Sequence, residues 1–457
     1  MGKSLSNKYH LIGIGGIGMS GLARILLSRG MQVSGSDLAQ NPTIAYLTSQ
    51  GAKIFSEHEE GNVPSQATVI YSTDIKQDNP EMQSAIKQKC RMIHRSDLLL
   101  ELTNGYKTLA VSGTHGKTTT SSLLTWTLDQ GDLSPAYAVG GIIPQFESNA
   151  GHGTGEYFVA EADESDGTFL TYDSFGTIIT NIGLDHMSTY GTEKELLRCF
   201  QTFMNNVSSD QHLFWCGDDI RLKNLNTKGY NYGFGSRCDL HISNYEQKEW
   251  GMKMDLHFLD QIFSNVEVAL TGQHNALNAA AVFGLALQVG VSEEKIRKAL
   301  ASFKGVQRRC EKKGEINDIL FLDDYAHHPT EIKTTLQGIR KAIQNRRLIV
   351  IFQPHRYSRT KDCLGTYKGI FDPADQLIIT DIFAARETPI PGITPQALIN
   401  EISENSQFQC QYEKRNELSD RIAEMVESGD VVVTLGAGDV THVGGEVMKK
   451  VQREVCI

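Results

Sequence analysis

A short glycine-containing loop carries the residues with the most specific chemistry in this sequence. It lies between an apolar stretch, 108–111, that predicts a buried strand and a stretch, 121–128, that predicts a helix. The loop reads Gly113-Thr114-His115-Gly116-Lys117-Thr118-Thr119. Backbone N–H groups at such a helix N-terminus face a phosphate, the lysine neutralises charge, and the next hydroxyl can hold Mg²⁺. Val111 replaces the first glycine of the general motif, so the loop is a shortened one. It predicts a nucleoside triphosphate site.

A second glycine loop follows a strand that we predict at 9–12. It reads Gly13-Ile14-Gly15-Gly16-Ile17-Gly18 and precedes a stretch with helical apolar spacing. A further strand is expected at 32–37 and ends in Ser36-Asp37. In the dinucleotide-binding pattern, the glycines and the helix N-terminus hold a diphosphate and the acid contacts a ribose or base. The same geometry suits any nucleotide diphosphate, so it predicts a diphosphate ligand without selecting NAD.

Acidic residues follow the next predicted strands. The strand at 157–161 ends in Glu161, and the strand at 176–182 leads to Asp185-His186. Ligands of open α/β sheets bind at the carboxyl ends of the strands, and Mg²⁺ prefers carboxylate, hydroxyl and phosphate oxygens. Glu161 with Thr118 is therefore the predicted first Mg²⁺ site. On chemistry alone, His186 is better interpreted as a structural, hydrogen-bonding histidine.

Two polar features lie farther along the chain. Asn275 begins a long apolar helix, where its amide could contact an adenine edge or could simply cap the helix. Arg308 and Arg309 are adjacent guanidiniums near an expected domain end. Arginine is suited to bidentate phosphate contacts.

The last third of the chain alternates predicted strands and helices, with polar residues after each strand. The strands are expected at 319–322, 348–352, 377–380 and 431–435. This predicts a third α/β domain whose polar edge faces a cleft. The histidines at 327, 328 and 355 lack the partners of a zinc motif, so zinc is the less favoured interpretation. His355, Arg356 and Arg359 instead predict a carboxylate-binding cluster.

Composition limits the class of protein. The chain has 457 residues, 40% hydrophobic and 21% charged, with a net charge of −10, which suits about three globular domains. No basic block suggests nucleic-acid binding, and no apolar run approaches a membrane span. The eight cysteines are scattered without C-x-x-C spacing, so a reducing cytoplasm is expected. We predict domains at 1–107, 108–312 and 313–457.

These motifs, in this order along the whole chain, resemble the Mur ligases of bacterial cell-wall synthesis, and most closely the branch that adds L-alanine. The resemblance implies three α/β domains: an N-terminal Rossmann-like domain, a central mononucleotide-binding domain and a C-terminal Rossmann-like domain. It also implies a reaction. ATP phosphorylates the lactyl carboxylate of UDP-N-acetylmuramic acid, and the amine of L-alanine attacks the acyl phosphate. Phosphate leaves and an amide remains.

The resemblance further implies a role for each matching residue. The catalytic set is Lys117, Glu161, His186 and His115. ATP contacts are Gly113 to Thr119, Asn275, Arg309, Asp324 and His327. Two Mg²⁺ ions are expected, with ligands from Thr118, Glu161 and His186. The UDP-sugar is expected at Gly13, Gly15, Gly16, Gly18, Ser36 and Asp37. L-Alanine is expected at Tyr325, His355, Arg356 and Arg359. No residue stands out as the base that deprotonates the amine.

Other functions remain open at this stage. A sister ligase would add a recycled peptide to the same sugar nucleotide, and should lack the 355–359 cluster in this form. An NAD-dependent oxidoreductase would use the first glycine loop, but would leave Lys117, Glu161 and His186 without a task. The expected partners are small-molecule substrates, with no nucleic acid and no membrane insertion. A monomer or weak homodimer is expected.

Overall fold

The computed structural model describes residues 7–39, 41–165, 167–185, 187–225, 227–404 and 409–454. The chain forms two compact units. The first comprises 1–243, 256–263 and 277–302, and the second comprises 244–255, 264–276 and 303–457. The position predicted to separate the first two domains, 107/108, thus falls inside the first unit, and 312/313 falls inside the second. None of the described helices is both long and apolar enough to cross a membrane.

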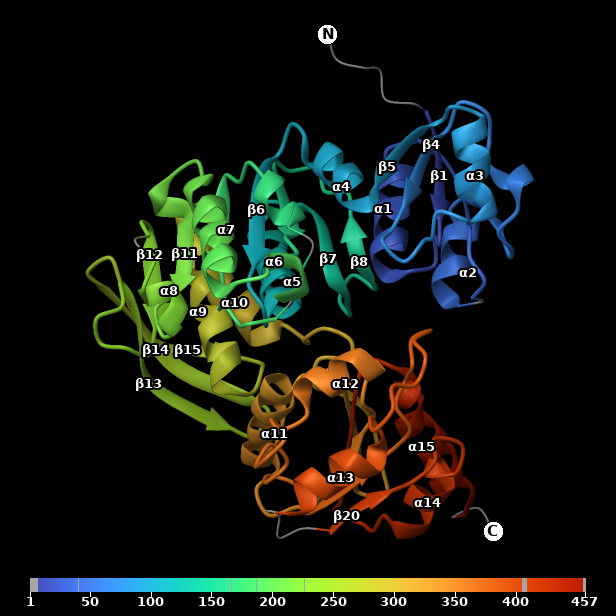
Figure 1. Ribbon diagram of the computed structural model, residues 1–457. Coiled ribbons are helices and arrows are strands. Elements are labelled where there is room, and N and C mark those ends of the chain that lie inside the picture. Colours follow the sequence, from blue (N-terminus) through green and yellow to red (C-terminus); the bar gives the residue numbers. More distant parts are fainter. Residues whose placement is uncertain are drawn as a thin grey trace. The chain divides into compact units, whose positions relative to one another are not determined.

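The N-terminal part of the first unit is a parallel sheet in the order β3-β2-β1-β4-β5. Its strands are β1 (Lys8–Ile12), β2 (Gln32–Ser36), β3 (Lys53–Phe55), β4 (Thr68–Tyr71) and β5 (Arg91–His94). Its helices are α1 (Ile17–Ser28), α2 (Pro42–Ser49), α3 (Pro80–Lys87) and α4 (Arg95–Thr103). The strand order reverses between β1 and β4, which is where doubly wound sheets bind ligands. Figure 1 draws the strands and helices of this part in shades of blue.

The second sheet has ten strands, in the order β15-β14-β13-β12-β11-β10-β6-β9-β7-β8. They are β6 (Lys107–Ser112), β7 (Ala136–Ile143), β8 (Ser148–Gly151), β9 (Tyr157–Glu161), β10 (Gly176–Ile179), β11 (Leu213–Cys216), β12 (Tyr230–Gly233), β13 (Leu240–Lys248), β14 (Gly251–Phe258) and β15 (Gln261–Val268). The helices are α5 (Lys117–Gln130), α6 (Met187–Tyr190), α7 (Glu193–Asn205), α8 (Ile220–Lys223), α9 (Gln273–Gln288) and α10 (Glu293–Ser302). β6 lies between β9 and β10, so all three polar strand ends meet beside the loop that follows β6.

The third sheet belongs to the second unit and has the order β16-β17-β21-β18-β19-β20. Its strands are β16 (Glu311–Ile316), β17 (Ile319–Asp324), β18 (Leu348–Phe352), β19 (Gln376–Ile379), β20 (Gln409–Tyr412) and β21 (Val431–Leu435). Its helices are α11 (Pro329–Ile343), α12 (Tyr357–Cys363), α13 (Pro395–Ser403), α14 (Leu418–Met425) and α15 (Val443–Glu454). Only β16 runs antiparallel to its neighbour.

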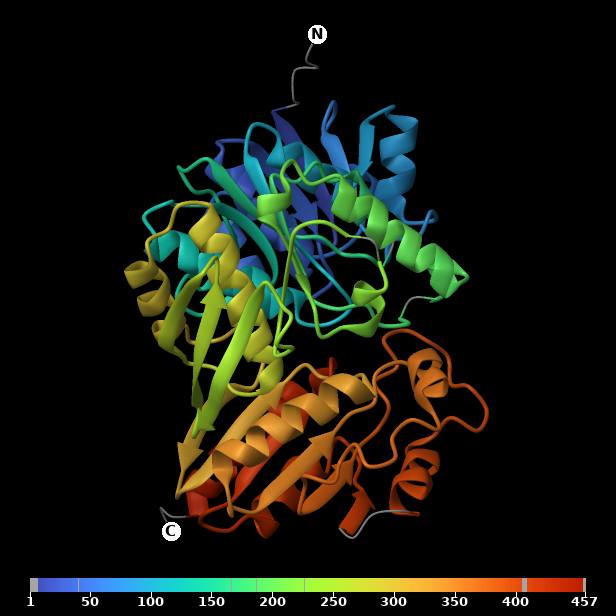
Figure 2. The ribbon, with the colours of Figure 1, turned by 90° about the vertical axis from the view of Figure 1, so that its left-hand side faces the viewer.

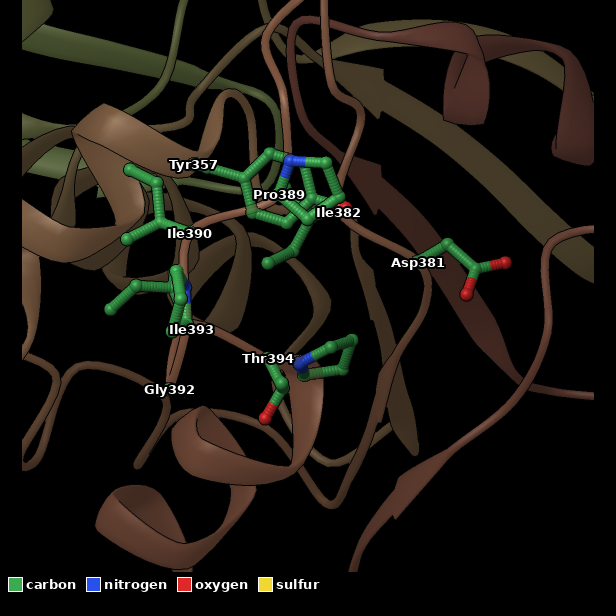
Figure 3. Close-up of a pocket in the computed structure, with 10 residues that line it drawn as sticks. Tyr357, Asp381, Ile382, Pro389, Ile390, Gly392, Ile393 and Thr394 are labelled. Atoms are coloured by element: carbon green, nitrogen blue, oxygen red, sulfur yellow. The ribbon is translucent and has the colours of Figure 1, made fainter.

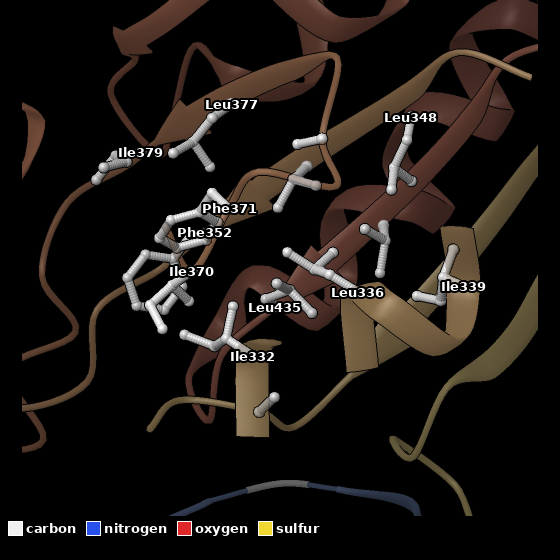
Figure 4. Packing of buried hydrophobic residues seen from close by; sticks show 14 of the residues in the cluster. Ile332, Leu336, Ile339, Leu348, Phe352, Ile370, Phe371, Leu377, Ile379 and Leu435 are labelled. Carbon is white, nitrogen blue, oxygen red and sulfur yellow. The ribbon is translucent and has the colours of Figure 1, made fainter. Parts of the chain in front are cut away.

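Alternation along its strands gives this sheet two apolar faces. Leu320 and Leu322 of β17 pack into one core with Leu336 of α11. Figure 4 shows part of this core, including Leu336. Phe321 points to the other face and packs with Val447 of α15. Period-two alternation assigns successive side chains to opposite faces, so helices cover both. Figure 2 shows these two helical layers around the sheet.

Local sequence also fixes where several helices begin. Proline occupies the first turn of α2, α3, α11 and α13, where its missing N–H has no intrahelical partner to lose. The residue before the proline caps each helix with its side chain. His328 caps α11, and Glu331 completes a capping box with it. The backbone between His327 and the first turn of α11 is therefore fixed by these capping hydrogen bonds.

Candidate functional site

The phosphate loop is braced by the end of β10. Gly113 has a φ of +129°, and a Cβ there would lie 2.2 Å from Oγ1 of Thr180, so only glycine fits. The N–H of His115 donates to Oδ1 of Asn181 over 3.0 Å, and the Asn181 amide donates back to the His115 carbonyl over 2.9 Å. Gly116 caps α5 with a φ of +86°. The first N–H groups of α5, which include those of Lys117, Thr118 and Thr119, therefore face out of the helix end.

Lys117 is held on a carboxylate. Its Nζ lies 2.7 Å from Oε2 of Glu164 and also donates to the Gly113 carbonyl over 2.7 Å. The side chains of Lys117 and Glu164 are 13% and 2% exposed. Burial alone would lower the pKa of Lys117, but the charges of Glu164, Asp163 and Glu161 raise it above its usual value. Lys117 is therefore a protonated ammonium at the mouth of the loop.

Thr118 and Glu161 form a pair of oxygen donors beside Lys117. Oγ1 of Thr118 donates to Oε1 of Glu161 over 3.0 Å, and the Gly140 N–H donates to Oε2 of Glu161 over 2.6 Å. A Cβ on Gly140 would lie 2.7 Å from both Glu161 oxygens and 2.8 Å from Oγ1 of Thr118. Glycine at 140 keeps that space clear. A hydroxyl and a carboxylate around a small space fit the preferences of Mg²⁺.

His186, which the resemblance assigned to a second metal, lies outside the described residues. Its neighbour Asp185 is half-buried.

The N-terminal glycine loop is held by the end of β2. The N–H groups of Gly13 and Ile14 donate to the Ser36 carbonyl over 2.8 and 3.0 Å. The Gly15 N–H donates to Oδ2 of Asp37 over 2.8 Å. A Cβ on Gly15 would come within 2.9 Å of the same oxygen. The predicted residues therefore meet at one point, with Gly16 as the cap of α1.

The structure separates the side chain of Ser36 from the others in this predicted set. Ser36 is fully buried, and its hydroxyl donates to Glu81, which also accepts from Asn62 over 2.8 Å. Because Oγ of Ser36 faces this internal network, its backbone carbonyl is the part of the residue that shapes the glycine loop. The side chain does not reach the surface of the loop.

A guanidinium that the sequence did not single out lies beside the same loop. A Cβ on Gly18 would come within 2.8 Å of Nη1 of Arg95, the first residue of α4. Within the described part of the chain, the Arg95 side chain forms neither an ion pair nor a hydrogen bond. It places a positive charge at the N-terminal end of α1, where the helix dipole also favours an anion.

In the second unit, β17 and β18 flank β21 and bring two polar loops to one sheet edge. The ring centroids of His327 and His355 are 5.8 Å apart, and those of Tyr325 and His327 are 5.4 Å apart. Nη1 of Arg359 lies 3.1 Å from Nδ1 of His355. Arg356 is exposed, and its backbone has a φ of +65°, which is uncommon for a residue other than glycine. Ring and guanidinium contacts thus connect four of the predicted residues in a row: Tyr325, His327, His355 and Arg359.

His355 is held as a neutral imidazole. Its ring stacks on Phe383 with an interplanar angle of 10°, at 5.7 Å between centroids. Burial lowers the pKa of His355 to about 3, with further lowering by His327, Arg359 and Arg356. Since Arg359 can only donate, Nδ1 of His355 accepts and Nε2 carries the proton.

The two adjacent arginines have different surroundings. Arg308 donates to the Gly436 carbonyl over 2.7 Å and to the Gly438 carbonyl over 3.2 Å, so it braces the loop after β21. Arg309 has no side-chain hydrogen bond to any described residue, and its guanidinium lies 5.3 Å from the Tyr325 ring centroid. Arg309 is therefore the one available to a ligand, as predicted for a phosphate contact.

Asp324 and Asn275 are buried. Oδ2 of Asp324 accepts from the Cys310 N–H over 2.6 Å and Oδ1 accepts from the Ala326 N–H over 2.7 Å. Burial raises the pKa of Asp324 to about 6 against the charge of Arg309. The amide of Asn275 donates to the Thr271 carbonyl over 2.8 Å. Asn275 lies inside α9, and this contact is donated to the chain before the helix, so it is not the N-cap acceptor contact that the capping alternative requires.

A cavity of about 360 Å³ lies nearby in the second unit. It is lined by isoleucines and prolines of 382–395, with Tyr357 on one side and Asp381 at its edge (Figure 3). Asp381 accepts hydrogen bonds from the Tyr412 hydroxyl and the Arg415 N–H. None of the residues predicted to bind substrate lines this cavity.

Family models match the chain in three consecutive parts. "Mur ligase family, catalytic domain" matches 8–107, "Mur ligase middle domain" matches 111–286, and "Mur ligase, glutamate ligase domain" matches 308–438. The chain belongs to the Mur ligase family. This confirms the family and the three-domain α/β architecture predicted from the motifs.

Two relatives that match over nearly their whole length are UDP-N-acetylmuramate–L-alanine ligases. The UDP-N-acetylmuramate–L-alanine ligase of Protochlamydia amoebophila is 54% identical, covering 96% of this chain and 97% of that protein. A namesake from Anaeromyxobacter is 40% identical over 98% of both chains. The chain spans 54% of the bifunctional enzyme MurC/Ddl of Chlamydia pneumoniae, at 44% identity.

A crystal structure of the UDP-N-acetylmuramate-alanine ligase of Thermotoga maritima matches with a TM-score of 0.84. It is 26% identical and covers 98% of this chain and 99% of that chain. A murein peptide ligase from Psychrobacter arcticus matches with a TM-score of 0.69 at 22% identity, which shows a shared fold.

Proposed function

We propose that the protein is an ATP-dependent ligase that joins L-alanine to the lactyl carboxylate of UDP-N-acetylmuramic acid in peptidoglycan precursor synthesis. The observation that carries this proposal is the 54% identity, over nearly the whole of both chains, to a ligase of that name. The carboxylate-binding cluster of the second unit supports it, because an amino-acid substrate needs such a site.

The phosphoryl transfer is assigned to the loop after β6. Lys117 neutralises charge on the transferring phosphoryl group, and the N–H groups at the start of α5 bind phosphate oxygens. Thr118 and Glu161 would hold one Mg²⁺, and His186 is proposed for a second. When bound, the metal supplies positive charge that offsets the phosphates. His115, whose N–H and carbonyl are both tied to Asn181, fixes the shape of the loop.

The sugar nucleotide is assigned to the N-terminal sheet. Gly13, Gly15, Gly16 and Gly18 let its diphosphate approach the start of α1, and Asp37 faces the ribose or base. We add Arg95 to this set, because it brings a guanidinium to the same loop and no described residue supplies a counter-ion for it. The side chain of Ser36 is withdrawn from the set, and its carbonyl keeps a structural role.

L-Alanine is assigned to Tyr325, His355, Arg356 and Arg359, with the guanidiniums on its carboxylate. Arg309, Asp324 and Asn275 are proposed on the nucleotide side, Asp324 and Asn275 through the backbone that they hold. We also propose a cytoplasmic location, supported by seven described cysteines that are all free, and a monomer or weak homodimer. The domains are proposed at 1–107, 108–312 and 313–457.

The acceptor is tested by competition. We would incubate the protein with ATP, Mg²⁺, UDP-N-acetylmuramic acid and a mixture of L-alanine, L-serine, glycine and a tripeptide. The products are identified by mass spectrometry. The L-alanine adduct should dominate. A tripeptide adduct would show that the protein is a ligase of the recycling type. The absence of any adduct would contradict the ligase proposal and favour an NAD-dependent oxidoreductase that uses the N-terminal loop.

A further inference from the structure

We propose that Nε2 of His327 is the base that takes the proton from the ammonium of L-alanine. The inference rests on the proposed function and gives His327 a task other than the nucleotide contact expected from the family resemblance.

The tautomer of His327 is fixed by its own loop. Nδ1 lies 3.0 Å from the Tyr325 carbonyl, which can only accept, so Nδ1 carries the proton. Nε2 then holds the lone pair, and no described residue donates a hydrogen bond to it. The side chain is 16% exposed, so the ring is held firmly while part of it stays accessible. The capping box of α11 fixes the backbone directly after it.

The neighbouring groups are less suited to the task. His355 already accepts from Arg359 at Nδ1, so its Nε2–H is a donor that can bind a carboxylate. Both oxygens of Asp324 accept backbone N–H groups, and the residue is 5% exposed. His328 accepts the Thr330 N–H at Nδ1 as the cap of α11. In this part of the described chain, that leaves Nε2 of His327 as the accessible lone pair beside the guanidiniums.

Burial and two nearby guanidiniums favour the neutral form of His327. Burial lowers the pKa of His327, Glu331 opposes this, and Arg359 and Arg309 lower it further. His355 faces it as a neutral ring. Arg359 is also assigned to the carboxylate of L-alanine, so its positive charge would lie near the ammonium and lower the pKa of that group as well. The pKa of the L-alanine ammonium then lies closer to that of His327 than it would in water, which favours proton transfer between them.

The step balances without an additional reactant. The ammonium of L-alanine gives one proton to Nε2, and the electron pair of that N–H bond becomes the lone pair that attacks the carbonyl carbon of the acyl phosphate. The carbonyl carbon–oxygen bond to phosphate then breaks with its electron pair. The second proton of the nitrogen leaves with the phosphate, and the imidazolium of His327 returns its proton to solvent.

The substitution that tests this is His327→Asn. The Asn amide can replace Nδ1–H as donor to the Tyr325 carbonyl, but offers no basic nitrogen in place of Nε2. Two nucleophiles are compared with ATP and UDP-N-acetylmuramic acid: L-alanine, which enters as an ammonium, and hydroxylamine, which is unprotonated at neutral pH. Hydroxamate formation reports the acyl phosphate without needing a base. His355→Asn is the matched control, because it alters the carboxylate contact.

The expected result is a kcat with L-alanine lowered roughly 10²–10⁴-fold in His327→Asn, with hydroxamate formation close to wild type. The deficit should shrink as pH rises and more amine is free in solution, whereas His355→Asn should mainly raise the KM for L-alanine at every pH. Equal loss with both nucleophiles would instead place His327 on the nucleotide and overturn the proposal. So would wild-type kcat with L-alanine. If the wild-type protein forms no hydroxamate at all, the proposed function itself fails.

Discussion

Nζ of Lys117 and Oε2 of Glu164 are 2.7 Å apart in a place that is nearly closed to solvent. The two residues are 47 positions apart in sequence and come from the first turn of α5 and the loop after β9. A phosphate that engages Lys117 must share it with this carboxylate or replace it. The affinity of the loop for phosphate should therefore depend on Glu164 as well as on the glycines.

Glu164→Gln should destabilise the first unit by about 3–5 kcal/mol, because it removes the carboxylate that is in direct contact with the buried Lys117 ammonium. Saturating ATP should raise the unfolding midpoint more in this variant than in wild type, since phosphate no longer competes with Glu164. Urea unfolding with and without ATP measures both effects. Glu195→Gln, which breaks the exposed pair with Arg198, serves as the control and should change little. Equal ATP stabilisation of Glu164→Gln and wild type would contradict the competition.

Gly140→Ala should weaken the binding of Mg²⁺ at Thr118 and Glu161. The new Cβ would press on Glu161 and Thr118, so the Mg²⁺ concentration for half-maximal activity should rise about tenfold, a magnitude typical of a disturbed metal site. A Mg²⁺ titration at saturating substrates measures it. Gly445→Ala, where a Cβ meets nothing within 4 Å, is the matched control. An unchanged Mg²⁺ dependence in Gly140→Ala would remove Glu161 and Thr118 as ligands.

Arg95→Ala should raise the KM for the sugar nucleotide. Losing a charge-assisted contact to a diphosphate is worth about 1.5–3 kcal/mol, so a rise of roughly 10- to 100-fold is expected, with the KM for L-alanine unchanged. Gly18→Ala should act in the same direction by displacing the guanidinium. Initial-rate kinetics with each substrate varied measures this. Lys87→Ala, at an exposed pair with Glu60, should leave both constants unchanged. A selective rise in the KM for L-alanine in Arg95→Ala would be the contrary result.

Stability of the second unit should fall as the solution is acidified below pH 6.5. Burial lowers the pKa of His274 to about 4 and that of His355 to about 3, while an unfolded imidazole titrates near 6.5. Between these values the unfolded chain binds more protons, so stability rises with pH through the window and is lost as pH falls. Each histidine should account for about 2 kcal/mol at pH 5.

Urea midpoints at pH 7.5 and pH 5.0 measure this dependence. His274→Gln should lose less stability between the two pH values than wild type, and His442→Gln, on an exposed side chain, should lose the same amount as wild type. A His274→Gln variant with the full wild-type loss would show that His274 does not resist protonation.

Local sequence was enough to predict the two glycine loops, the strands that precede them and the polar strand ends. Each of these is encoded by neighbouring residues: Gly113 and Gly116 sit at positive φ where only a glycine is easily accommodated. The adjacency of Thr118 and Glu161 followed from parallel strands sharing one edge. The family resemblance then supplied roles that spacing alone left open, such as those of His327 and Tyr325.

Other parts of the site depend on packing that no local pattern encodes. Arg95 reaches Gly18 only because β5 and α4 fold back beside α1, and Gly140 approaches Glu161 because β7 pairs with β9. The resemblance implied that Ser36 contacts the UDP-sugar, but its hydroxyl is buried and donates to the carboxylate of Glu81. Glu164 could have been noticed from the acidic run 161–166, although nothing in that run selects it as the partner of Lys117.

The most direct test of the central claim follows oxygen atoms. UDP-N-acetylmuramic acid labelled with ¹⁸O in its lactyl carboxylate is incubated with ATP, Mg²⁺ and L-alanine, and the released phosphate is analysed by mass spectrometry. Ligation through an acyl phosphate predicts one ¹⁸O atom in each phosphate released, together with the amide product. Label in AMP, or unlabelled phosphate alongside the amide product, would contradict the account.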